Sequence, residues 1–232
     1  MTTTSRAQRG REHREARQRA KQQQQRKQRL MFAIVGAVVL VLAVVIGVLT
    51  VGESADRAAV PSTTEVAGDP TIEGEPLPGA PEDPSTDQAA GDPVPVASGA
   101  DFDGEPVTVG EPGTPQLVMF MASWCPACQE ELPEVVEWLD AGGLPEDVEI
   151  VSVATSLDDT RPNWPPQDWF EEEGYDGPVL VDDVSSSVAE AYGLQATPYW
   201  VAIDGDGQVA VRVSGMIGQE QLDALADTVS GT

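Results

Sequence analysis

Two cysteines separated by two residues constrain this chain more than any other feature. Cys125 and Cys128 are the only cysteines in 232 residues. The apolar run at residues 116–122 precedes them and is typical of a buried strand, whereas the residues that follow have helical spacing. A cysteine pair at a junction of strand and helix can bind metal, form a structural disulfide or exchange disulfides.

The first two roles fit the sequence poorly. A structural zinc site needs four ligands, and the chain adds only His13, which lies far away in a basic segment. We therefore expect no metal. A structural disulfide stabilises mainly by closing a loop, and the gain shrinks with loop length. A Cys-x-x-Cys ring is too small to be an effective crosslink.

Thiol-disulfide exchange has a clear physical basis at this position. If the helix begins near Cys125, its free N–H groups and macrodipole favour a thiolate there, and a lowered pKa creates the attacking species at neutral pH. Pro126 fits the first turn, where its missing N–H costs nothing. Cys128 follows almost one turn later. We predict Cys125 as the nucleophile and Cys128 as the resolving thiol.

Charge is divided sharply along the chain. The formal net charge is −26, yet most of the basic residues lie in residues 1–29. After residue 50 the only basic residues are Arg57, Arg161 and Arg212. A surface this acidic argues against nucleic-acid binding.

An uncharged apolar run at residues 30–51 is long enough to span a membrane as a helix. A cleavable signal peptide has a shorter apolar core, so we expect an uncleaved single-pass anchor in the cell membrane. The positive-inside rule places the basic tail, residues 1–29, in the cytoplasm and the rest outside. Residues 52–97 are rich in Pro, Gly and acidic side chains and are expected to form a disordered linker.

Residues 98–232 are predicted to fold as one α/β domain. Strands are expected at residues 106–109, 116–122, 148–154, 178–181, 200–203 and 208–213. Helices are expected at residues 126–141, 165–173, 185–192 and 219–229, with Pro133 inside the first. This order allows helices to cover both faces of a central sheet.

The motif Trp124-Cys125-Pro126-Ala127-Cys128, Pro133, and Thr197-Pro198 ahead of a hairpin together resemble the thioredoxin fold. More narrowly, residues 98–229 resemble the membrane-anchored TlpA/ResA-type thiol-disulfide oxidoreductases. The resemblance implies a central mixed sheet flanked by helices. It also implies that residues 157–176 hold the helical insertion of the TlpA-like branch.

The resemblance assigns roles to particular residues. Pro198 would be a cis proline that faces the cysteine pair and places Thr197 where a substrate strand pairs. With Trp124 and Pro126, these residues form the expected substrate-binding set. For Trp124, shielding of the pair and ordinary core packing remain alternatives.

Glu131 matches an acidic residue that follows the motif in ResA-like proteins, whereas Met119 replaces the buried Asp of plain thioredoxins. A partly buried carboxylate there would have a raised pKa and could relay protons for Cys128. The alternative is a solvated helix glutamate, because several others lie nearby.

The resemblance implies an enzyme that reduces disulfides of exported proteins, with cytochrome c maturation as the best-known use. No cofactor is expected. Electrons would come from a membrane thiol carrier of the CcdA/DsbD type, because the compartment is oxidising. An oxidase that forms disulfides and a non-catalytic assembly or binding module remain alternatives.

Overall fold

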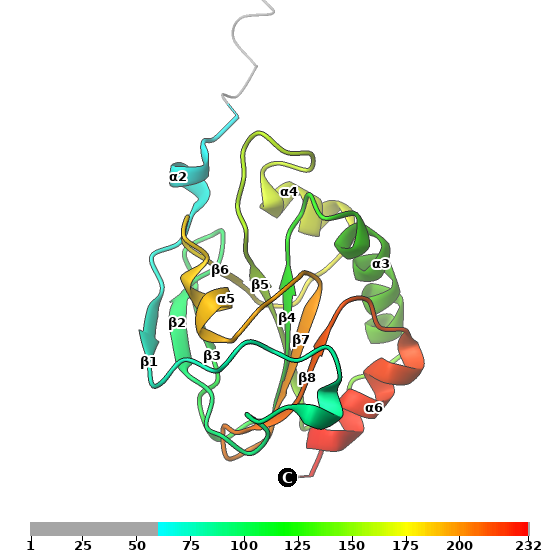
Figure 1. Ribbon diagram of the computed structural model, residues 1–232. Coiled ribbons are helices and arrows are strands. Elements are labelled where there is room, and N and C mark those ends of the chain that lie inside the picture. The colour runs from blue at the N-terminus through cyan, green and yellow to red at the C-terminus, as the bar shows by residue number, and fades with distance from the viewer. Residues whose placement is uncertain (1–59, 232) are drawn as a thin grey trace, which may run out of the picture. The chain divides into compact units, whose positions relative to one another are not determined.

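A mixed five-stranded sheet lies at the centre of the protein, with strand order β6-β5-β4-β7-β8 (Figure 1). The computed structural model describes residues 60–231. The strands are β4 (Gln116–Met121), β5 (Glu149–Ala154), β6 (Val179–Val181), β7 (Tyr199–Ile203) and β8 (Val209–Ser214). The first three are parallel, while β7 is antiparallel to both β4 and β8. The predicted α/β class and mixed sheet are confirmed.

Strand β4 is buried along its whole length, which explains its unbroken apolar sequence after Gln116. Leu117, Met119 and Met121 contribute to the core on one face of the sheet. Val118 and Phe120 contribute to the core on the other face. The alternation follows from the two-residue period of a strand, and it makes β4 the wall between two hydrophobic cores.

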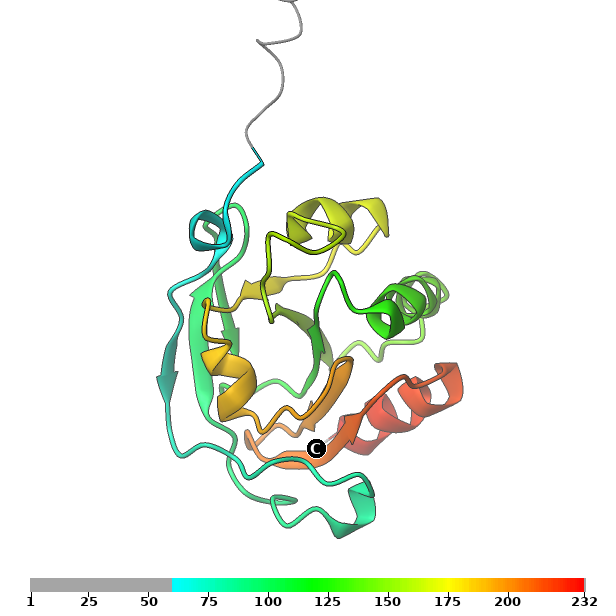
Figure 2. The same cartoon turned by 45° about the horizontal axis from the view of Figure 1, so that its top comes forward.

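Three helices lie along one face of this sheet (Figure 2). They are α3 (Pro126–Asp140), α4 (Pro166–Glu172) and α6 (Gln219–Val229), and their buried residues belong to one core. The short helix α5 (Ser187–Ala191) lies on the opposite face with the second core. The predicted strands and helices from residue 106 onward therefore exist, with ends that differ by at most two residues.

The prediction of a disordered linker over residues 52–97 is wrong from residue 60 onward. Residues 60–97 contribute to a three-stranded antiparallel sheet of order β1-β2-β3 on the second core. Its strands are β1 (Thr71–Glu73), β2 (Val96–Ala100) and β3 (Pro106–Val109). A short helix α2 (Thr63–Val66) and a 3-10 helix η1 (Pro84–Thr86) complete the segment. The compact unit therefore begins at residue 60, and not at the predicted residue 98.

Composition failed here because the segment adds to an existing core and builds none of its own. Its few apolar side chains that are buried, Leu77, Ala89, Val94 and Ala97, all pack in the second core. Backbone hydrogen bonds attach it to the rest of the fold as well, for example from Leu77 N to Ala191 O and from Val94 N to Gly207 O. A chain with little apolar surface is ordered when a neighbouring surface supplies the rest.

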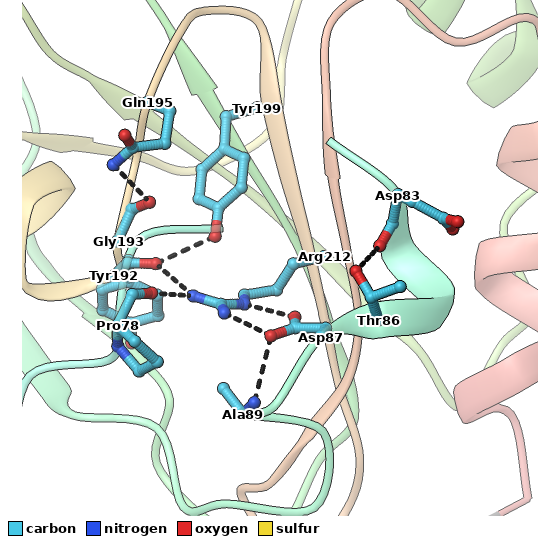
Figure 3. A network of polar contacts seen from close by, with 10 residues as sticks. All are labelled: Pro78, Asp83, Thr86, Asp87, Ala89, Tyr192, Gly193, Gln195, Tyr199 and Arg212. Carbon is cyan, nitrogen blue, oxygen red and sulfur yellow. Dashed lines mark hydrogen bonds and ion pairs between the residues drawn. The ribbon is translucent and has the colours of Figure 1, made fainter. Parts of the chain in front are cut away.

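A buried ion pair reinforces this attachment (Figure 3). The side chain of Arg212 on β8 is fully buried, and its guanidinium pairs with both carboxylate oxygens of Asp87. The remaining nitrogen donates to the carbonyls of Pro78 and Tyr192, at 2.7 and 3.3 Å. Burial is the largest single effect on Arg212 and opposes its charge, but the interactions with Asp87 and Tyr199 together outweigh burial and raise the pKa of Arg212. Arg212 in turn lowers the pKa of Asp87.

Gly193 makes room for this network after α5. Its φ angle is +76°, and a Cβ atom there would lie 2.3 Å from Pro78 O and 2.7 Å from an Arg212 nitrogen. Only glycine satisfies both the left-handed backbone and the close approach.

The predicted basic tail and the predicted membrane span, residues 1–29 and 30–51, lie outside the described residues. Within residues 60–231, no helix combines the length and apolar character needed to cross a membrane.

We expect Asp87→Asn to lower the free energy of unfolding by about 3–5 kcal/mol, because it leaves the buried Arg212 charge without its counterion. Denaturant unfolding of the full-length chain measures this change. Asp158→Asn is the matched control, because it breaks an exposed ion pair: the side chain of Arg161 is 51% exposed and that of Asp158 is 41% exposed. This substitution should cost no more than about 1 kcal/mol. Equal effects of the two substitutions would contradict the importance of the buried pair.

Candidate active site

The cysteine pair lies where β4 gives way to α3. Cys125 is the N-cap residue of α3, with extended backbone angles, and its N–H donates to Ala122 O at 2.9 Å. Pro126 occupies the first helical position, as predicted, and its side chain is exposed. The first-turn N–H groups of α3 are therefore directed toward the Cys125 sulfur.

The two thiols differ in exposure. Both are free in this structure, but Cys125 is half-buried while Cys128 is fully buried in the core beneath α3. A partner disulfide can therefore reach Cys125 directly, whereas Cys128 is accessible only from Cys125 itself. This asymmetry fits the predicted division into nucleophile and resolving thiol.

The pKa values of the thiols diverge in the same sense. Partial burial raises the pKa of Cys125, but hydrogen bonds from the Thr197 side chain, from Cys128 and from the Ala127 N–H outweigh it. The resulting pKa is lower than that of an ordinary cysteine. Burial raises the pKa of Cys128 to about 12, and a backbone hydrogen bond at Ala122 offsets only part of this rise. Cys125 is therefore the thiol of the pair that ionises more readily.

Thr197 lies against the pair, although 72 residues separate it from Cys125. The Thr197–Pro198 peptide bond is cis, which confirms that expectation. The Cys125 sulfur lies 3.4 Å from Thr197 O. Pro198 is buried at the entry to β7, whereas Thr197 is half-buried. The half-exposed backbone beside the reactive sulfur is where an extended substrate segment would align.

Trp124 lies at the rim of the site and outside both hydrophobic cores. Its ring is half-buried, and its Nε1 donates to Ser156 O at 2.7 Å. The guanidinium of Arg161 lies over the indole, 4.4 Å from the ring centroid. The indole therefore packs against a surface loop and not in either core, and its shielding of Cys125 stays a prediction.

Glu131 is buried, with only 1% of the residue exposed. The alternative of a solvated helix glutamate is therefore wrong. Its Oε1 accepts hydrogen bonds from Ile217 N at 2.7 Å and from Trp200 Nε1 at 3.1 Å. Its Oε2 is buried and has no partner among the described residues. Burial raises the pKa of Glu131 to about 7, against these hydrogen bonds, and the nearby charge of Glu134 adds to the rise.

Glu131 also follows Cys128 by three residues on α3, and residues at this spacing lie on the same side of a helix. The structure therefore combines a thiol that resists ionisation with a carboxylate that titrates near neutrality. Proton transfer between Glu131 and Cys128 stays a prediction, because it also requires the carboxylate and the thiol to come within hydrogen-bond reach.

The contacts of the loop at residues 156–164 with the motif were not predicted from the sequence. Asn163 Nδ2 donates to Ser123 O at 3.0 Å, and Ser156 O accepts from Trp124. Ser156 and Asn163 both have positive φ angles, 53° and 57°. The one sequence feature that pointed to this loop was Arg161, a basic residue in an acidic region. The contacts of the loop themselves arise from tertiary structure. Helix α4 follows the loop, within the region predicted as a TlpA-like insertion.

We expect alkylation at pH 7 to label Cys125 at least about a hundredfold faster than Cys128, because only Cys125 has a lowered pKa. Iodoacetamide labelling of the reduced full-length chain, followed by peptide mass spectrometry, measures both rates. In denaturant the two thiols should react at similar rates. Equal labelling of the native protein would remove the basis for separate roles.

Comparison with known proteins identifies the family of this chain. The family model described as Redoxin matches residues 89–224, which is more than half of the chain. The methylamine utilization protein MauD of Methylophilus methylotrophus is 30% identical over 144 residues, covering 60% of this chain and 62% of that protein. The chain thus matches about three fifths of the length of this relative.

Solved structures show a similar fold. A thiol:disulfide interchange protein of the thioredoxin family from Chlorobium tepidum TLS has a TM-score of 0.51 and 23% identity, covering 62% of this chain and 99% of that one. A putative thiol:disulfide interchange protein DsbE from Chlorobium tepidum has a TM-score of 0.51 and 19% identity, covering 61% and 98%. The chain therefore belongs to the Redoxin family, and its described part has the thioredoxin fold.

Proposed function

We propose that this protein is a thiol-disulfide oxidoreductase that reduces disulfide bonds of exported proteins through Cys125 and Cys128. The observation that carries the proposal is the contrast between the two thiols. Cys125 is accessible, has a lowered pKa and lies beside the Thr197 backbone, while Cys128 is buried directly behind it. Membership of the Redoxin family supports the same chemistry.

The reaction proceeds in two exchanges. The Cys125 thiolate attacks one sulfur of the substrate disulfide, and the other substrate sulfur leaves as a thiolate that takes up a proton. Cys128 then loses its proton and attacks the Cys125 sulfur of the mixed disulfide, which releases the second substrate thiol. Two electrons pass to the substrate, and the protein is left with a Cys125–Cys128 disulfide. A separate dithiol must reduce this disulfide before the next cycle.

Glu131 is the proton acceptor in the second exchange under this proposal. Its pKa of about 7 makes it a base at neutral pH, whereas the pKa of Cys128 is about 12. In the reverse direction the protonated carboxyl returns the proton to Cys128. Trp124, Pro126, Thr197 and Pro198 surround Cys125 and contact the substrate segment.

Tethering to the cell membrane is part of the proposal. It rests on the uncharged run at residues 30–51 and the basic segment that precedes it, which would place Cys125 outside the cytoplasm. A membrane thiol carrier of the CcdA/DsbD type would then supply the electrons, and apocytochrome c is one suitable substrate. The likeness to TlpA/ResA-type proteins, including helix α4 in the corresponding region, supports these assignments.

We expect Cys128→Ser to accumulate mixed disulfides through Cys125, because the resolving thiol is gone. Non-reducing electrophoresis and mass spectrometry of trapped partners would detect them. Cys125→Ser should show no insulin reduction and trap no partner, and the double Ser variant is the matched control for background exchange. Insulin reduction by Cys125→Ser at the wild-type rate would overturn the proposed function.

We expect Glu131→Gln to slow disulfide release at pH 8 by about tenfold or more, because general-base catalysis is lost. The wild-type rate should rise with pH through about 7 as Glu131 ionises, and the variant should lack this inflection. Stopped-flow measurement of the release step gives both profiles. Glu130→Gln, an exposed neighbour on α3, should retain the wild-type profile.

Stability provides an independent measure of the Glu131 pKa. Because burial raises this pKa from 4.5 to about 7, the folded state holds the proton more tightly than the unfolded state. The wild type should therefore lose about 3 kcal/mol relative to Glu131→Gln as pH rises from about 4.5 to above 7. An unchanged difference in unfolding free energy, together with an unchanged rate profile, would exclude the relay.

A further inference from the structure

Arg161 is unusual among the described residues because it is an exposed cation. Residues 60–231 contain two basic side chains, Arg161 and Arg212. Arg212 is fully buried and paired with Asp87. The side chain of Arg161 is 51% exposed. On a surface rich in Asp and Glu, it is the single positive charge that a partner can contact within this part of the chain.

This charge lies at the rim of the cysteine site. The guanidinium carbon of Arg161 is 4.4 Å from the ring centroid of Trp124, and Trp124 immediately precedes Cys125. A guanidinium that stacks on an indole keeps its N–H donors at the edge of the stack, free to bind another group.

The interactions of Arg161 within the protein leave most of its donors available. Its one ion pair joins Nε to Asp158 at 3.7 Å, and both side chains are largely exposed. Thr160 accounts for most of the lowering of the Asp158 pKa, through side-chain and backbone hydrogen bonds, and Arg161 contributes least. No hydrogen bond joins the terminal nitrogens of Arg161 to any described residue.

The loop that carries Arg161 is attached at both ends to the active-site segment. Trp124 donates to Ser156 O, and Asn163 donates to Ser123 O. These contacts hold the loop beside the motif, so the guanidinium is positioned before a substrate arrives.

A second attachment comes from the N-terminal segment. Thr63 N donates to the Asp159 carboxylate at 2.9 Å, and Asp159 N donates to the Thr63 hydroxyl at 3.1 Å. Trp164 Nε1 donates to Pro61 O. The loop at residues 156–164 is thus connected to two other parts of the fold, which limits its freedom to move away from Trp124.

We propose that Arg161 is a specificity residue that binds a carboxylate of the substrate, next to the cysteine that Cys125 attacks. This inference rests on the proposed function and adds to it the substrate class. Because Arg161 is the one exposed positive charge in residues 60–231, a substrate carboxylate is favoured at the position from which it reaches this guanidinium. Arg161 is not proposed to lower the pKa of Cys125, because hydrogen bonds from Thr197, Cys128 and Ala127 account for that lowering.

A panel of short peptides tests the inference. Each peptide holds one cysteine joined by a disulfide to 2-thiopyridine, an uncharged leaving group that absorbs when released. One Asp occupies each of the three positions on either side of the cysteine in turn, and each peptide has an Asn twin. The rate of thiopyridone release by the reduced full-length chain measures attack by Cys125.

We expect the Asp peptide to react about two- to fivefold faster than its Asn twin for at least one position, the size of a single exposed charge pair. Arg161→Gln should bring this ratio to about one, and the ratio to the Asn twin removes any general effect of the substitution on the rate. Arg161→Lys should keep part of the preference, because the charge remains while the planar fork is lost. Added salt should reduce the wild-type ratio.

Gln219→Glu is the matched control. It changes the net charge by the same amount as Arg161→Gln at an exposed position on α6, and should keep the wild-type ratio. The inference is overturned if no position favours Asp in the wild type, or if the preference survives in Arg161→Gln. If the wild-type protein reduces all peptides at equal rates, only the specificity is refuted. If it reduces none of them, the proposed function is refuted as well.

Discussion

The opposite environments of two thiols one helical turn apart are the constraint on which this site depends. The chain leaves β4 at Met121 and begins α3 at Pro126, so the intervening residues turn sharply at the end of the sheet. Cys125 caps the helix and remains accessible, whereas the helical turn carries Cys128 into the core. The same geometry that orders the helix therefore separates the pKa values of its two sulfur atoms.

A second consequence of α3 is the burial of Glu131. The helix packs against β7 and the segment that leads to α6, and Trp200 and Ile217 from these elements bind a single carboxylate oxygen. The other oxygen has no partner among the described residues. A buried carboxylate with hydrogen bonds to only one of its two oxygens is stabilised in its protonated form, which raises its pKa into the neutral range.

The N-terminal segment, residues 60–97, links the stability of the fold to the arrangement of its site. Its middle part carries Asp87, which neutralises the buried Arg212, and its strands complete the second core. Its first residues, Pro61 and Thr63, hold the loop that faces Trp124. A segment poor in apolar residues thus contributes through hydrogen bonds and one ion pair, each made to a surface that the rest of the chain provides.

Much of the site was readable from local patterns. The apolar run before Cys125, the proline after it and the helical spacing beyond it depend on neighbours in sequence, and the structure has the strand and helix they predict. The placement of Thr197 and Pro198 came from the family resemblance, because no local rule brings residues 72 positions apart together.

Local sequence alone determined the strands from β3 onward and the helices from α3 onward, and it predicted Cys125 as the attacking cysteine and Cys128 as the resolving one. Tertiary structure decided whether Glu131 was solvated or buried, whether residues 60–97 were ordered, and where Arg161 lay. The physical reason is the same in each case. Burial, ion pairing and cation–π stacking depend on groups that distant segments supply, and sequence composition does not record which surfaces will meet.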